Sequence, residues 1–135
     1  MADAVATQKI SDGGKFATFK FTNVSDGSGE SAVAKVDVSA LSKDPVTGQA
    51  CSKVSILGIT YSTVGMSVKV FFNASTDVLV WHCIADYSDT LDFSGFSGIP
   101  NNAGSGVNGD VNFTTVGHTN TDTYCIVLKL LKHYG

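Results

Sequence analysis

Alternation of apolar and polar residues along short runs is the feature that most constrains how this chain can fold. In the run KFATFKFT, the side chains of Ala17, Phe19 and Phe21 recur at every second position. Side chains with that spacing lie on one face of a β-strand, whereas those of an amphipathic helix recur every three or four residues. We therefore expect this run to be a strand, with these three side chains on one face.

The same alternation occurs in the runs SAVAKVDVSAL, SVKVFFN, DVLVWHCI and DTYCIVLKLLKHY. DVLVWHCI is apolar on both faces, and strands of that kind are usually covered on both sides, so we expect it at the centre of the fold. The final run ends in KLLKHYG, which is compatible with a short helix, but the alternating β-branched residues before it favour a strand. The side chains expected to share a face within their run are Ala32, Ala34, Val36, Val38; Val68, Val70, Phe72; and Tyr124, Ile126, Leu128, Leu130.

Clusters of Gly, Asn, Asp and Ser separate the alternating runs at short intervals. Short strands divided by such turns are typical of β-sandwiches and barrels, and a chain of 135 residues suits one domain. We therefore predict a single-domain, all-β fold over residues 1–135. It is an antiparallel β-sandwich of about eight or nine short strands, jelly-roll-like or Ig-like. Residues 1–8 are a candidate extended arm, and residues 92–109 form a long glycine-rich loop.

That loop, DFSGFSGIPNNAGSGVNG, carries large apolar side chains among its glycines. Loops of this length without their own secondary structure are usually functional. One interpretation is that Phe93, Phe96 and Ile99 contact a partner protein. The other is that they fold back onto the core as an Ω-loop. We take these three residues as the candidate interface.

The stretch NVSDGSGES, residues 23–31, lies between two alternating runs and contains the carboxylates Asp26 and Glu30. Gly27 and Gly29 permit a positive φ, and Asp26 can hydrogen-bond to its own backbone. A calcium site would need several converging carboxylates, and the EF-hand spacing is absent. We interpret the stretch as a turn that reverses the chain.

The balance of charges argues against some partners. Only 16% of the residues are charged, the net charge is −3, and all nine cations are lysines. Arg provides the planar donor that binds phosphate and guanine edges, so we do not expect this chain to bind nucleic acid. A surface poor in ions loses little hydration when it packs against another protein, which favours a member of an assembly.

The three cysteines, Cys51, Cys83 and Cys125, lie in apolar strand-like runs. An odd number is a poor disulfide framework, and a reduced thiol behaves as a small apolar group. We expect all three thiols to be reduced and largely buried, in a protein that folds in a reducing compartment. The chain shows no apolar region of a secretory signal and no window long enough to span a membrane, so we expect neither secretion nor membrane contact.

No residue pattern in the chain specifies a reaction. The spacing of His and Cys lacks the paired ligands of zinc sites, and the serine-hydrolase and phosphate-loop motifs are missing from the sequence. The acidic cluster Asp86, Asp89 and Asp92 is expected to be solvated. We therefore expect no enzyme activity, no metal and no cofactor. The residues considered as zinc ligands are His82, Cys83, His118, Cys125 and His133.

Aromatic side chains could form a platform for a sugar ring. Trp81 lies in the most apolar run, so packing in the core explains it better. A carbohydrate-binding module is the alternative function, because β-sandwiches often carry such sites. The aromatic residues concerned are Tyr61, Trp81, Tyr87, Tyr124 and Tyr134.

The tracts FTNVSDGSGESAVAKVDVSALS and NNAGSGVNGDVNFTTVGHTNTDTYCIVLKLLK resemble small virion structural proteins of tailed bacteriophages, especially phages of marine cyanobacteria. The similarity is one of overall pattern and extends from about Lys9 to Tyr134. The resemblance implies a non-enzymatic β-domain that decorates or cements the capsid, or belongs to the neck or tail. It implies contacts with the major capsid protein or other virion proteins, homo-oligomerisation in the assembly, and a location in the virion after synthesis in the host bacterial cytoplasm. It implies no site residues.

Overall fold

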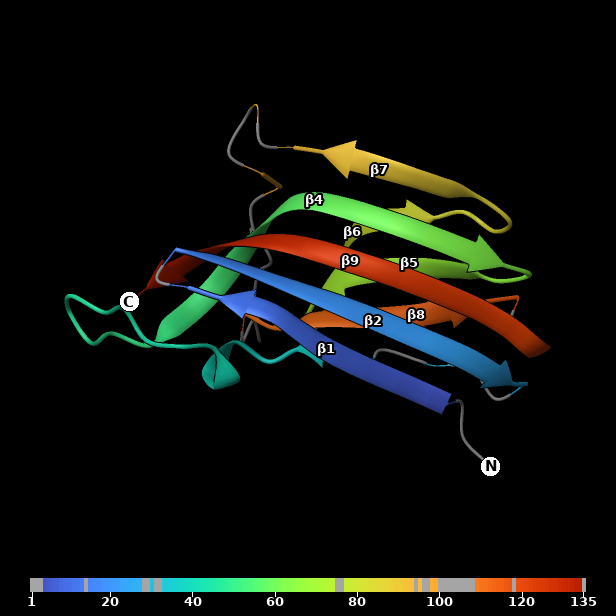
Figure 1. Ribbon diagram of the computed structural model, residues 1–135, viewed down its shortest axis with the longest axis horizontal. Coiled ribbons are helices and arrows are strands. Elements are labelled where there is room, and N and C mark those ends of the chain that lie inside the picture. Colours follow the sequence, from blue (N-terminus) through green and yellow to red (C-terminus); the bar gives the residue numbers. More distant parts are fainter. Residues whose placement is uncertain are drawn as a thin grey trace.

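Figure 1 shows the computed structural model, which describes residues 4–13, 15–27, 30, 33–74, 77–93, 95, 98–99, 109–117 and 119–134. This part of the chain contains nine strands and one short 3-10 helix, so the predicted all-β class is confirmed. The terminal stretch before Gly135 is a strand, as the alternation favoured. In chain order the elements are β1 (Ala4–Asp12), β2 (Phe16–Asp26), β3 (Val33–Val36), η1 (Val38–Ala40), β4 (Cys51–Val64), β5 (Ser67–Phe72), β6 (Val78–Cys83), β7 (Ser88–Asp92), β8 (Val111–Val116) and β9 (Asn120–Tyr134).

The strands form two antiparallel sheets that pack face to face, which confirms the β-sandwich. One sheet has five strands in the order β1-β2-β9-β4-β7, and the other has four in the order β3-β8-β5-β6. The pairing is nested, with β2 against β9, β3 against β8, β4 against β7 and β5 against β6. Early strands therefore pair with late strands, as they would if one long hairpin were rolled up into two sheets. Of the two predicted sandwich types, this is the jelly roll.

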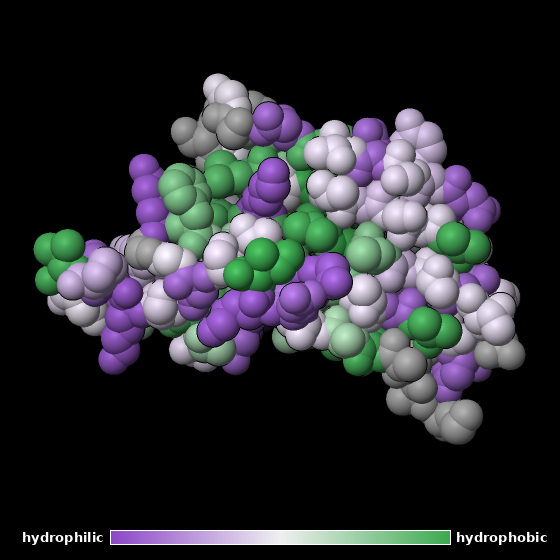
Figure 2. Space-filling view, viewed as in Figure 1, coloured by the Kyte–Doolittle hydropathy of each residue, from purple (hydrophilic) through white to green (hydrophobic). Residues whose placement is uncertain are grey.

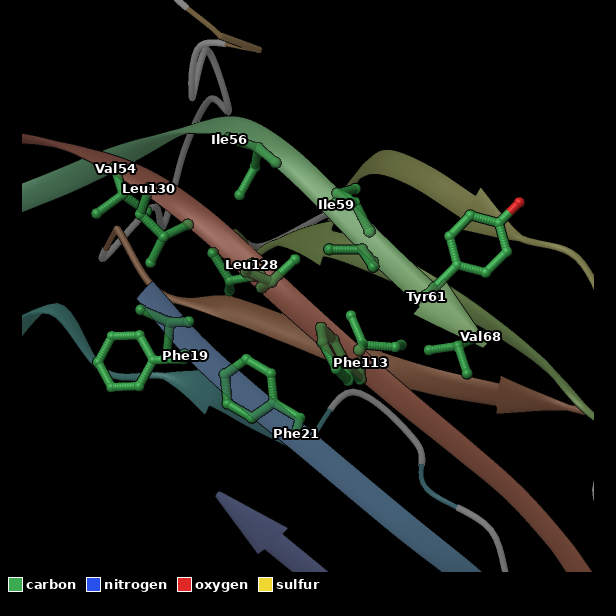
Figure 3. Packing of buried hydrophobic residues seen from close by; sticks show 14 of the residues in the cluster. Phe19, Phe21, Val54, Ile56, Ile59, Tyr61, Val68, Phe113, Leu128 and Leu130 are labelled. Atoms are coloured by element: carbon green, nitrogen blue, oxygen red, sulfur yellow. The ribbon is translucent and has the colours of Figure 1, made fainter. Parts of the chain in front are cut away.

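The core lies between the sheets and is built from the alternating runs (Figure 3). In β2, Ala17, Phe19 and Phe21 are at most 9% exposed, as the period of two predicted. The rings of Phe21 and Phe113 meet edge to face across the sheets, with centroids 5.2 Å apart. The shared faces predicted for β5 and β9 are also buried: Val68, Val70 and Phe72 in β5, and Tyr124, Ile126, Leu128 and Leu130 in β9.

Strand β3 departs from the predicted alternation. Val36 and Val38 are buried, but Ala34 is exposed and Ala32 lies outside the described residues. The reason is a bulge between Ala34 and Val36 in the pairing with β8, which moves Ala34 to the outer face. The single shared face predicted for this run is therefore wrong.

Strands β2 and β3 do not form a hairpin. β2 belongs to the five-stranded sheet and β3 to the four-stranded sheet, so the connection crosses from one sheet to the other. Gly27 has a φ of 98°, and its N–H donates to the Ser25 hydroxyl at 3.0 Å. β2 pairs with β9 and not with β3. Residues 28–29 and 31–32 lie outside the described residues, so the predicted turn that reverses the chain stays a prediction.

Strand β6, the run predicted to be central, is an edge strand of the four-stranded sheet. Within the described residues it pairs with β5 alone. Its inner face reaches the core through the half-buried Trp81, whose ring centroid lies 5.4 Å from that of Phe93. On its outer face Leu79, 50% exposed, lies opposite Phe71 of β5. The run is apolar on both faces because its outer face carries half of an apolar cross-strand pair, and not because both faces are covered. The prediction that this strand is central is therefore wrong.

Burial of the thiols differs from the prediction at one position. Cys51 and Cys83 are 4% and 0% exposed, and burial raises the pKa of the Cys83 thiol to about 12. Cys125 is exposed, because it occupies the outer face of β9 beside the buried Tyr124. The prediction that all three thiols are largely buried is therefore wrong for Cys125. All three are free thiols in the structure.

Candidate functional site

Strand β1 is an edge strand with an open side. It pairs with β2 from Ala4 to Asp12, and no other described strand pairs with it. All of its residues from Val5 to Ser11 are exposed, and it lies along the lower edge of the sheet in Figure 1. Of the candidate arm, residues 1–8, residues 4–8 are thus part of the sheet, and residues 1–3 lie outside the described residues. An open edge of this kind presents backbone N–H and C=O groups to another strand.

The inner face of β1 is uncovered. Val5, Thr7 and Lys9 share the inner face of the sheet, because Thr7 and Lys9 lie opposite the core residues Phe21 and Phe19. Strand β3 of the other sheet has only four residues, and two of them, Lys35 and Val36, lie across a hollow from Thr7 and Lys9. A hollow of about 280 Å³ remains at this corner. It is lined by Thr7, Lys9, Phe19, Lys35, Val36, Asp37, Ala40 and Leu41.

The C-terminal half of β1 is protected in two ways. The strand has a bulge between Lys9 and Ser11, where Ile10 is the extra residue. Lys9 places a charge on the inner face, and inward-pointing charges commonly prevent edge strands from pairing with other chains. The open stretch therefore extends from Ala4 to Gln8. Val5, 51% exposed, is its large apolar side chain.

The end of β1 is held by a buried ion pair. The Lys132 ammonium, whose side chain is fully buried, donates to Asp12 Oδ1 at 2.6 Å. It also donates to the Gly13 carbonyl at 2.9 Å and to the Ser42 carbonyl and hydroxyl at 2.8 Å. Burial raises the pKa of the Asp12 carboxyl, but hydrogen bonds from Lys132 and Ser42 outweigh burial and leave the pKa below its ordinary value.

A second buried polar cluster surrounds Glu30, in the crossing between the sheets. One carboxylate oxygen accepts hydrogen bonds from Asn23 Nδ2 at 3.0 Å and from the Tyr124 hydroxyl at 2.5 Å. The other oxygen lies 2.5 Å from Lys35 Nζ, and both side chains of this pair are 6% exposed. No local pattern predicts this cluster, because in the sequence Glu30 is one of two acids in an expected turn.

The structure contains one serine–histidine contact of the kind a serine hydrolase uses, but this contact is not part of a catalytic triad. Ser55 Oγ and His133 Nε2 are 2.8 Å apart, but Ser55 is only 3% exposed. Burial and the nearby Lys53 lower the pKa of His133. None of the described carboxylates is hydrogen-bonded to His133. This arrangement lacks both the orienting acid and the open nucleophile that a hydrolase uses.

The residues considered as zinc ligands are not brought together where the structure describes them. His82 is exposed on the outer face of β6, and Cys83 is buried on the inner face, so these neighbours point apart. No group of three His, Cys, Asp or Glu residues within reach of one metal ion occurs among the described residues. His118 lies outside them.

The candidate interface in the long loop is only partly described. Phe93 is 9% exposed, and its N–H donates to the Leu57 carbonyl at 2.7 Å. Ile99 is half-buried against the core and exchanges two backbone hydrogen bonds with Ile56, at 3.0 and 2.9 Å. Both residues therefore lie as the folded-back interpretation describes. Phe96 lies outside the described residues, and its contact with a partner stays a prediction.

The outer face of the five-stranded sheet is rich in hydroxyl groups. Figure 2 shows it as mostly hydrophilic and intermediate, with hydrophobic residues scattered between. A hollow of about 270 Å³ lies on this face, and Thr60 and Thr90 face each other in it at 3.4 Å between hydroxyl oxygens. The residues around it are Leu57, Gly58, Ile59, Thr60, Thr90, Leu91, Asp92 and Lys129.

The aromatic residues considered as a sugar platform do not line this hollow. Tyr61 and Tyr124 are buried in the core, at 4% and 2% exposure. Trp81 packs on Phe93, and Tyr87 is half-exposed.

The described residues include no helix long and apolar enough to cross a membrane. Comparison of the chain with protein-family models, with curated proteins and with solved structures finds no match.

Proposed function

We propose that this protein is a non-enzymatic structural component of a phage virion, which decorates or cements the capsid through protein–protein contacts. Its partners are the major capsid protein or other virion proteins, together with further copies of itself. The protein acts in the particle after synthesis in the host bacterial cytoplasm. The observation that carries this proposal is the open edge of β1 beside an uncovered hollow, since such an edge serves to add a strand from another chain.

The open stretch from Ala4 to Gln8 supplies both parts of such a contact. Its backbone groups along the free side bind an incoming strand by main-chain hydrogen bonds. The hollow beside Thr7 and Lys9 accepts alternate side chains of that strand, which makes the contact selective. Val5 adds apolar surface that a partner would bury.

The composition supports the same function. Only 16% of the residues are charged, so few ions lose water when subunits pack against each other. Jelly rolls are common among viral capsid proteins, and they are also common among lectins. The fold by itself therefore does not choose between these two classes, and the edge of β1 is what favours assembly.

The proposal is tested by placing charges on the open edge. Val5→Lys combined with Thr7→Lys adds two inward-facing charges to an exposed strand, so folding should be unaffected while strand addition is blocked. We expect the amount of the variant bound to particles that lack the protein to fall about tenfold or more. The control is Val64→Lys, a comparable change at a position that is 57% exposed on β4.

Wild-type copy number in purified particles is measured by quantitative mass spectrometry alongside this assay. A protein absent from the particles would contradict the virion role. Full incorporation of the folded double variant would contradict the use of the β1 edge. A regular copy number on capsid faces, seen by electron microscopy, separates decoration from a neck or tail position.

Carbohydrate binding is the second candidate, and the hollow on the outer face favours it. Two threonine hydroxyls, the Asp92 carboxylate and the Lys129 ammonium surround a space that suits part of a sugar. A glycan array with wild type and with Thr60→Val plus Thr90→Val tests this. Binding of a glycan that the variant loses would support it, and an array without binding would exclude it for the glycans displayed.

A further inference from the structure

The cluster around Glu30 places a lysine and an asparagine on the two oxygens of one buried carboxylate. Lys35 Nζ lies 2.5 Å from one oxygen, and Asn23 Nδ2 lies 3.0 Å from the other. We propose that Lys35 and Asn23 become joined by an intramolecular isopeptide bond, with Glu30 as the acid–base catalyst. The bond would link β2 of one sheet to β3 of the other.

The groups are held in place from several directions. Asn23 is 1% exposed and lies opposite Tyr124 in the β2–β9 pairing. The Glu30 N–H donates to the Thr115 hydroxyl at 2.8 Å, and its carbonyl accepts from the Thr115 N–H at 2.9 Å, so the backbone of this residue is fixed to β8. The Tyr124 hydroxyl fixes the carboxylate itself. The Lys35 ammonium and the Asn23 amide thus sit on the two oxygens of the same carboxylate, which holds the two reacting groups beside each other.

The surroundings favour the chemistry. The ring centroid of Phe113 lies 5.9 Å from that of Tyr124 and 5.2 Å from that of Phe21, so aromatic groups border the cluster. In such a site, transfer of a proton from an ammonium to a carboxylate removes two buried charges. A lysine that has lost its proton and its water shell is a nucleophile.

The reaction balances without any added reagent. Glu30 takes a proton from the Lys35 ammonium, and the neutral amine adds to the side-chain carbonyl carbon of Asn23. Glu30 returns the proton to the departing nitrogen, the carbon–nitrogen bond of the Asn23 amide breaks, and ammonia leaves. The attacking nitrogen then gives its second proton to Glu30, and ammonia takes that proton away as ammonium, which restores the Glu30 carboxylate. A Lys–Asn amide remains.

The other buried lysine provides an internal control. Lys132 is also paired with a carboxylate, but its further partners are two backbone carbonyls and a hydroxyl, with no side-chain amide among them. A buried ion pair that only supports the fold needs no asparagine on its acid. The difference between the two clusters is what points to a reaction at Glu30.

Intact-mass spectrometry of the folded protein tests the proposal. Wild type should be lighter than its sequence by about 17 Da, the mass of ammonia, and a proteolytic digest should contain one peptide that joins the segments around Asn23 and Lys35. Lys132→Arg should keep this loss of mass. Asn23→Asp should lose water instead of ammonia, about 18 Da.

Glu30→Gln and Lys35→Arg should both have the full mass of their sequences. Lys35→Arg keeps the positive charge, so it separates loss of the bond from loss of the ion pair if Glu30→Gln does not fold. A folded wild-type protein with its full sequence mass would overturn the proposal. So would a mass loss that persists in Lys35→Arg, or that maps to other residues.

Discussion

The two edges of the five-stranded sheet are built differently. Strand β7, at one edge, has five residues, and Asp89 and Asp92 are two of them. Asp89 lies opposite the buried Tyr61, so its carboxylate is on the inward-facing side of an edge strand. Strand β1, at the other edge, has nine residues, and its first half carries no charge from Ala4 to Gln8.

This difference indicates which edge is kept free for a partner. Short length and inward-facing charge are the usual means by which proteins prevent edge strands from pairing with other chains. β7 has both, whereas β1 has Lys9 and a bulge only in its second half. The same sheet thus closes one edge and leaves part of the other open. The following predictions test that contrast, from the largest expected effect to the smallest.

The largest effect is expected at the ion pair that holds the end of β1. Lys132→Ala leaves the Asp12 carboxylate buried without its cation, which costs about 3–5 kcal/mol of the free energy of unfolding. Urea denaturation measures it. Lys129→Ala, an exposed lysine of the same strand, is the control and should change stability by about 0.5 kcal/mol or less. Equal effects of the two substitutions would show that the ion pair does not anchor β1.

A slightly smaller effect is expected just after β7. Phe93→Ala removes a ring that is 9% exposed and packs on Trp81, so we expect a loss of about 3 kcal/mol from burial and cavity formation. The control is Phe16→Ala at the start of β2, where the ring is 51% exposed and little is lost. A melting temperature of Phe93→Ala equal to that of wild type would mean that this residue is not part of the core.

Acid should weaken the anchor of β1. The pKa of Asp12 is below its ordinary value in the folded protein, so the unfolded chain takes up the proton at higher pH than the folded protein does. The stabilisation is complete above the unfolded value and is lost as pH falls through the folded pKa. Below about pH 4, the free energy of unfolding of wild type should fall more steeply than that of Asp12→Asn. Parallel curves from urea denaturation across pH would contradict this.

The smallest effect on stability is expected at β7. A substitution there also tests most directly whether the two edges of the sheet differ in their tendency to pair with other chains. Asp89→Val removes the inward-facing charge from an exposed position, so the free energy of unfolding should change by about 0.5 kcal/mol or less. Self-association should increase, because the guarded edge becomes more like β1. Sedimentation velocity over a range of concentrations measures this. A variant that self-associates no more than wild type would show that the charge does not prevent pairing at this edge.

The period of two could be read directly from the sequence because it is a local property. Each residue's side relative to its neighbours depends only on backbone geometry, so the faces of β2, β5 and β9 were predicted correctly. The same reasoning predicted an all-β sandwich of eight or nine strands, and the described residues contain nine. It failed at β3, where a bulge that depends on the pairing with β8 breaks the alternation.

The tertiary structure alone decided which strands are neighbours. Strand order in turn decided which residues meet at the open edge and in the cluster around Glu30. Strand pairing joins residues far apart in the chain, so no local pattern could reveal that β6 and β1 are edges. Glu30 looked like a turn residue, yet the crossing between sheets carries it between Asn23, Lys35 and Tyr124. Alternation determines which side chains share a face. Which face is covered, and by what, depends on the packing of the whole chain.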